Sequence, residues 1–219
     1  MAAGPVEKGC ARTHLCYRNG CTVNDSKMGD HKMTTTSTAP ARSALPAGTW
    51  QIDPAHSSLE FQVRNMGLVT VKGFFSDFDG ALEVAEDGTA RAEGTVRVAS
   101  VHTRSEKRDE HLRAPDFFDV ERHPEIAFRV TGVEPDGDGL RVNGELTIKG
   151  ITRPIELQAE VTGSGPDPWG GERVGVLARG EVDRRDFDLH WDVRTPTDVP
   201  LVSHTVTVEA NIGAVKQTD

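Results

Sequence analysis

The sequence predicts an all-β protein in which about eight antiparallel strands close into a barrel, with one short helix and a disordered N-terminal tail. In one stretch after another, apolar residues alternate with polar ones at the period of two that half-buried strands show. The turns between these stretches are short, and only one stretch favours a helix. Parallel strands need crossover helices, so the sheet is expected to be antiparallel and to close, which removes its exposed edges.

A hairpin over residues 143–157 is the clearest of these elements. Leu146 and Ile148 alternate with polar neighbours on its first arm, and the second arm repeats the pattern. Lys149-Gly150 provides the reversal between the arms. Two arms of this length cannot bury their apolar faces alone, so further strands must surround them.

The other expected strands are separated by turns rich in Gly, Pro and Asp. All the expected strands cover residues 49–64 (broken at Asp53-Pro54), 69–75, 81–84, 92–101, 126–133, 140–148, 155–161, 174–182, 187–191 and 202–212. Their inward residues are mostly aliphatic or Phe. The interior is therefore either a dry cavity suited to an elongated hydrocarbon, or a core filled by these side chains.

The one expected helix covers residues 105–113, which are dense in helix formers. Thr103 and Glu106 have the spacing of a capping box, and Pro115 ends the helix. Phe117 and Phe118 follow in a loop or helical turn. Exposing both rings would be unfavourable, so at least one is expected to plug the core.

The charge distribution divides the chain into regions. Residues 1–48 carry 6 Lys and Arg against 3 Asp and Glu, a net of +3, whereas residues 49–219 carry 19 against 31, a net of −12. We expect a disordered tail over 1–48, one barrel domain over 49–215 and a C-terminal tail over 216–219. The acidic domain repels phosphate backbones, so nucleic acid is not an expected partner. No apolar run is long enough to span a bilayer.

The N-terminal region contains all three cysteines, Cys10, Cys16 and Cys21. Their spacing matches no common zinc pattern, so free thiols are favoured over a metal or redox site, and no metal or cofactor is expected. The region lacks the basic stretch followed by an apolar one that marks a secretory signal, which predicts a cytoplasmic protein. Three methionines are alternative starts, Met1, Met28 and Met33.

Four motifs occur in order along the chain. They are Asp53-Pro54-x-His56-Ser57-x-Leu59-x-Phe61, Gly73-Phe74-Phe75 with Phe78-x-Gly80, His111-Leu112-Arg113-x-x-Asp116-Phe117-Phe118-Asp119-Val120, and Gly144-x-Leu146-Thr147-Ile148-Lys149-Gly150-Ile151-Thr152-x-Pro154. Through them, residues 49–215 resemble the YceI-like family of polyisoprenoid-binding proteins. The resemblance implies a lipocalin-like barrel that holds a long isoprenoid chain in its apolar interior.

Two positions depart from that family's pattern. Asn65 stands where the family often has a histidine, which alters any charge presented to a head group. Asp188 stands where the family often has a glycine, and Asp tolerates glycine-like backbone angles better than most residues. Many members are secreted or periplasmic, unlike the location predicted for this chain.

The resemblance implies non-enzymatic binding, storage or transport of a polyisoprenoid or isoprenoid quinone-like lipid. Its tail is expected to contact the apolar side chains assigned to the inward face, namely Phe61, Val63, Phe75, Val98, Phe117, Phe118, Ile126, Phe128, Leu146, Ile148, Val206 and Val208. Candidates for the polar head are His56, Arg104, Arg108, His111 and Arg113. For the cations near the helix, a solvated helix face balanced by acidic residues is the alternative.

An enzyme acting on a small apolar substrate is the main alternative function, with His56 as base and Asp53 orienting it. Adjacent residues of an extended segment point to opposite sides, so Ser57 is poorly placed as its nucleophile. No nucleophile-elbow motif follows, and a structural role for His56 at the barrel rim is favoured. A third alternative is a stress-linked interaction module with a filled barrel. A homodimer is compatible with each.

Overall fold

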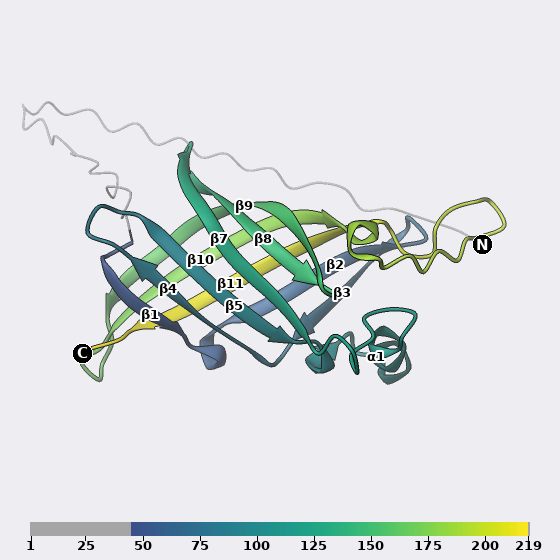
Figure 1. The fold of residues 1–219 in the computed structure, drawn as a ribbon, viewed down its shortest axis with the longest axis horizontal. Helices are drawn as coiled ribbons and strands as arrows, with labels where there is room; N and C mark the ends of the chain where they lie inside the picture. Colours follow the sequence, from purple (N-terminus) through teal and green to yellow (C-terminus); the bar gives the residue numbers. More distant parts are fainter. Residues whose placement is uncertain (1–44, 219) are drawn as a thin grey trace, which may run out of the picture. The chain divides into compact units, whose positions relative to one another are not determined.

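Residues 45–218 are described by a computed structural model, in which one antiparallel sheet curls into a closed barrel (Figure 1). The predictions for the N-terminal tail, including its three cysteines and alternative starts, lie outside the described residues. The strands are β1 (Gly48–Ile52), β2 (Ser58–Asn65), β3 (Val69–Phe75), β4 (Phe78–Val84), β5 (Ala90–Arg97), β6 (Val101–His102), β7 (Glu125–Asp136), β8 (Gly139–Ile148), β9 (Ile151–Pro166), β10 (Glu172–Asp183) and β11 (Thr205–Lys216). The described helices are α1 (Glu106–Arg113) and the short 3-10 helices η1 (Pro54–His56), η2 (Val98–Ser100) and η3 (Arg184–Phe187).

The barrel has eight strands, because three of them are broken into two segments. The sheet runs in the order β1-β4-β5-β7-β8-β9-β10-β11 and closes by pairing of β1 with β11. β1 and β2 are the two segments of one strand, and both pair with β11. β4 and β3 are the segments of the next strand and pair with β1 and β2 respectively. β5 and β6 are the segments of the third, and pair with β4 and β3. The predicted closed antiparallel barrel of about eight strands is confirmed.

Local chemistry explains the first break and two of the turns. Pro54 has no N–H to give to a sheet, and the backbone N–H of Asp53 still bonds the carbonyl of Gly213 at 2.8 Å. The β8–β9 hairpin turns where Lys149 and Gly150 have φ of +51° and +74°, as a two-residue hairpin loop with positive φ requires. Asp188 adopts a φ of +57°, so the turn with Asp in place of glycine is retained.

Three local predictions are wrong. The N-cap of α1 is Ser105, whose side chain makes no capping bond, and Thr103 instead bonds a carboxylate inside the helix. The strand predicted over 92–101 is interrupted by η2. Residues 187–191 do not form a strand: η3 ends at Phe187, Leu189 is buried in the core, and Trp191 is partly buried against it.

Two apolar clusters lie at opposite ends of the barrel. Near α1, a cluster that contains Phe117 is formed from the helix, the segment after it and the ends of several strands, which confirms the predicted core plug. At the other end, where β1 lies beside the C-terminus in Figure 1, Trp50 of β1 packs with Val84, Val174 and Ala214. The space between these clusters is where the candidate site lies.

Candidate functional site

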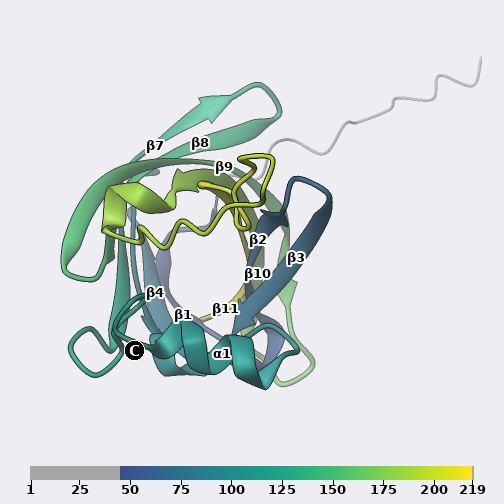
Figure 2. The ribbon, with the colours of Figure 1, turned by 90° about the vertical axis from the view of Figure 1, so that its right-hand side faces the viewer.

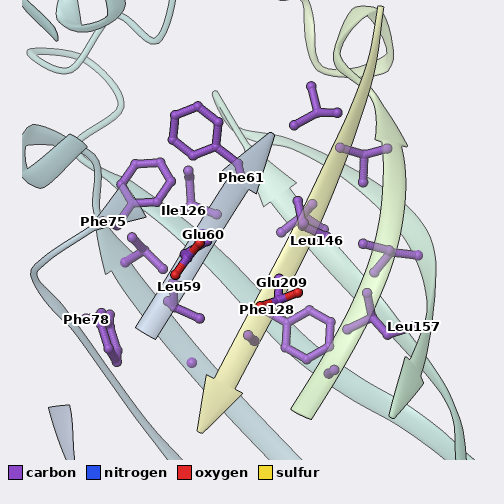
Figure 3. A pocket seen from close by; sticks show the side chains of 18 of the residues that line it. Leu59, Glu60, Phe61, Phe75, Phe78, Ile126, Phe128, Leu146, Leu157 and Glu209 are labelled. Atoms are coloured by element: carbon purple, nitrogen blue, oxygen red, sulfur yellow. The ribbon is translucent and has the colours of Figure 1, made fainter. Parts of the chain in front are cut away.

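The barrel interior is hollow. A cavity of about 540 Å³ lies within it, bounded almost entirely by apolar side chains from the inward faces of the strands (Figure 3). The alternative of an interior filled by its own side chains is therefore wrong. By strand alternation, Glu60 and Glu209 project to the opposite face from Phe61 and Val208, and Glu209 pairs outside with Arg179 at 2.6 Å.

Small residues in the wall keep the interior open. Ala159, Ala178 and Ala210 are paired side by side across β9, β10 and β11, and all three border the cavity. The aromatic rings are accommodated in a different way. A Cβ at Gly73 would come within 2.2 Å of the Phe61 ring, so the ring occupies the space above a glycine of the neighbouring strand.

Most of the predicted tail-contacting residues border this cavity. Those that do are Phe61, Val63, Phe75, Phe117, Phe118, Ile126, Phe128, Leu146, Ile148, Val206 and Val208. Val98 does not border the cavity, which corrects its predicted place: the chain leaves the strand at η2, and Val98 packs in the cluster beneath α1 with 1% of its surface exposed. Lipid contact by the other eleven stays a prediction.

The predicted head-group residues separate into two sets. Arg108 and His111 border the cavity at the end of the barrel where α1 lies along the rim, which Figure 2 faces. Arg104 is exposed and does not border the cavity. Arg113 does not border it either, because its guanidinium bonds the carbonyls of Ala99 and Val101, each at 2.9 Å.

His56 lies in η1, away from the cavity wall. Its Nδ1 is 2.8 Å from Oδ2 of Asp53, and Arg173 bonds the same oxygen at 2.7 Å. The hydrogen bonds from Arg173 and His56 lower the pKa of Asp53 to about 2. The hydroxyl of Ser57 donates to the carbonyl of Asp53 at 2.7 Å and accepts from the N–H of Gly213 at 2.9 Å. The arrangement matches the predicted rim bond, and the catalytic alternative stays an untested prediction.

A buried polar network joins α1 to the barrel. Asp109 is 3% exposed, and its Oδ1 accepts from the backbone N–H of Thr103 at 2.8 Å and from the Thr103 hydroxyl at 2.5 Å. His102 and Arg108 complete the network, at 3.0 Å from Asp109 and 2.7 Å from Thr103. Burial raises the pKa of Asp109, but the bonds from Thr103 and the charge of His102 outweigh it, so the pKa lies below its ordinary value.

Asp109→Ala is expected to lower the free energy of unfolding by about 1–3 kcal/mol, because the buried N–H of Thr103 loses its partner. The depressed pKa also fixes the pH dependence: this stability is present above the ordinary carboxyl pKa of 3.8 and is lost as pH falls below it. Urea unfolding of both proteins at pH 7 and pH 3 measures this, and the difference between them should shrink at pH 3. Glu110→Ala, on the exposed side of the helix, is the control.

The described part of the chain contains neither a metal-binding cluster nor a helix that could span a membrane. Within residues 45–218, no three His, Cys, Asp or Glu side chains come together as a metal site would require. None of the helices in that range has the length and apolar character needed to cross a membrane.

With the barrel and its cavity established, the chain can be compared with known proteins. A family model described as the YceI-like domain matches residues 50–214. This chain belongs to the YceI-like family. It is 36% identical to Protein YceI of Escherichia coli O157:H7 over 151 residues, which cover 67% of this chain and 79% of that one.

Solved structures agree with this family. The YCEI protein of Campylobacter jejuni matches with a TM-score of 0.61 and 26% identity, over 69% of this chain and 88% of that one. A polyisoprenoid binding domain from Saccharophagus degradans matches with a TM-score of 0.59 and 18% identity, over 77% and 98%. At that identity, the second match supports the fold alone. The predicted family and the lipocalin-like barrel are confirmed.

The structure also reveals a site residue that the strand pattern did not indicate. Arg184 is 3% exposed and borders the cavity, although it lies in a charged run, Asp183 to Asp186, that is typical of a surface turn. The signal available was weak: Arg184 follows a strand whose inward residues alternate from Val174 to Val182, which places it at the cavity end.

Proposed function

We propose that this protein binds a long-chain lipid of the polyisoprenoid class in its barrel and stores or carries it without transforming it. The observation that supports this most is the apolar cavity of about 540 Å³ inside the barrel. Its volume falls within the roughly 300–1,000 Å³ of small-molecule sites, and its lining is mostly apolar, with polar side chains such as Arg108 and Arg184 gathered at the α1 end.

The energetics favour a long chain over a small substrate. Each buried CH₂ group is worth about 0.8 kcal/mol, so ten buried carbons supply on the order of 8 kcal/mol. Association costs are estimated at about 4–15 kcal/mol. Only a ligand with many apolar carbons is therefore held tightly, and the S. degradans domain, whose fold is similar, is described as binding a polyisoprenoid.

Extraction of the purified protein tests this proposal. After expression, purification and denaturation, an organic extract analysed by mass spectrometry should contain a prenyl lipid in near-stoichiometric amount. Protein stripped of lipid should take up an added polyprenyl quinone, measured by tryptophan quenching. Empty extracts combined with no uptake of the quinone would overturn the proposal.

A further inference from the structure

Arg184 is a buried cation at one end of a cavity whose lining is mostly apolar. Its Nε donates to the carbonyl of Ser203 at 3.0 Å, and its two terminal nitrogens donate to the carbonyls of Leu189 and Val202. These bonds use three of the five N–H groups of a guanidinium. Because all three acceptors are neutral, the positive charge of Arg184 is not balanced by them.

The two carboxylates whose charges act on Arg184, those of Asp183 and Asp192, are each bound by another arginine. Asp183 is paired with Arg185 at 2.5 Å, and Asp192 with Arg194 at 3.0 Å. Among residues 45–218, no carboxylate forms an ion pair with Arg184. Burial accordingly lowers the pKa of Arg184, against the opposing charges of Asp192 and Asp183 at longer range. Arginines are almost never fully buried without a charged partner, so this site is incomplete as the protein alone presents it.

The polar groups of the cavity identify the end where a lipid head would lie. Thr103, Arg108 and His111 border it at the α1 end, together with Arg184. At the opposite end the wall is apolar and includes Val174 and Ala214 from the Trp50 cluster. An amphiphile is therefore stabilised with its tail toward Trp50 and its head toward Arg184, since the reverse orientation would bury the head among aliphatic side chains.

We propose that Arg184 is the head-group site, and that the bound lipid carries an anionic oxygen there, as a carboxylate or a phosphate does. The inference rests on the proposed lipid binding and adds the class of head group. Such an oxygen would accept hydrogen bonds from the N–H groups of Arg184 that do not bond the three carbonyls, and it would neutralise the buried charge. A neutral alcohol or hydrocarbon of the same length would leave that charge unbalanced.

A matched lipid series on the unmodified protein is the first test. Prenyl monophosphate, prenyl carboxylic acid, prenyl alcohol and the hydrocarbon, all of one chain length, are compared by displacement of a fluorescent fatty probe. We expect the two anions to bind at least about tenfold more tightly than the alcohol. The phosphate and carboxylate arms distinguish the two sources of anionic oxygen. Equal affinity for anions and alcohol would overturn the head-group site alone, whereas no binding of any member would overturn the proposed function.

Substitutions at Arg184 test whether this residue causes the preference for anionic lipids. In Arg184→Met the ratio of anion to alcohol affinity should fall to near one while the alcohol still binds, and Arg184→Lys should keep part of the ratio. Arg113→Met is the matched control, because Arg113 also bonds two backbone carbonyls but does not border the cavity. An unchanged ratio in Arg184→Met would contradict the proposal.

Because Arg184 also binds the 189–203 segment, Arg184→Met could fail to fold. The ¹⁵Nε resonance of Arg184 in the unmodified protein, assigned by its loss in Arg184→Lys, then decides the question. It should shift on addition of prenyl monophosphate or of prenyl carboxylic acid, and not on addition of prenyl alcohol. No shift with either anion would overturn the site.

Discussion

Ala178→Trp is expected to abolish lipid binding while leaving the barrel folded. Ala178 lies between Ala159 and Ala210 in the register of three neighbouring strands, where small side chains leave the interior open. An indole there would project into the cavity and deny the lipid on the order of 150 Å² of apolar contact, worth about 4 kcal/mol. Since 1.4 kcal/mol is a factor of ten, affinity should fall at least about 100-fold. Titration with a polyprenyl quinone measures this loss.

Leu177→Trp is the matched control for this prediction. Leu177 is the neighbour of Ala178 on β10, does not border the cavity, and points to the outer face of the sheet by strand alternation. The same side chain introduced there should leave lipid affinity within about twofold. Because Ala178→Trp adds volume to a hollow rather than to a packed core, circular dichroism and the urea midpoint should change little. Full lipid affinity in Ala178→Trp would show that the ligand does not occupy the barrel.

The strands and their closure were predictable because their signals are local. Alternation of the kind seen around Leu146 and Ile148 reports which face of a strand is buried, whichever strand it pairs with. The Lys149-Gly150 turn was equally readable, since a two-residue hairpin loop needs positive φ and Gly provides it. For the same reason, the apolar wall of the cavity was largely predictable residue by residue.

The polar end of the cavity was not predictable, because it depends on where the chain goes after leaving the sheet. Val98 continues the alternation of β5, but the backbone turns at η2 and carries it into the cluster under α1. Arg184 stands in a charged run that reads as surface, yet carbonyls from residues up to 19 positions away hold it inside. Whether the interior is hollow depends on the combined volume of all the inward side chains, so the sequence of any single strand does not predict it.

Trp50→Ala is expected to lower the free energy of unfolding by about 3–5 kcal/mol, as loss of a large buried aromatic side chain does. Trp50 is 0% exposed, packs with Val174 and Ala214, and its indole N–H donates to the carbonyl of Pro46 at 3.1 Å. Urea unfolding followed by circular dichroism measures the change, since fluorescence would itself be altered by losing a tryptophan.

Trp169→Ala provides the comparison, because that side chain is 82% exposed and its removal should cost less than about 0.5 kcal/mol. Equal losses of unfolding free energy in the two variants would contradict the burial of the cluster around Trp50. Lipid affinity should separate them as well. Val174 and Ala214 border the cavity and pack against Trp50, so removing the indole should loosen this part of the cavity wall, admit water there and weaken binding of the proposed lipid. We therefore expect the Trp50 cluster to contribute to both stability and lipid affinity through the same contacts.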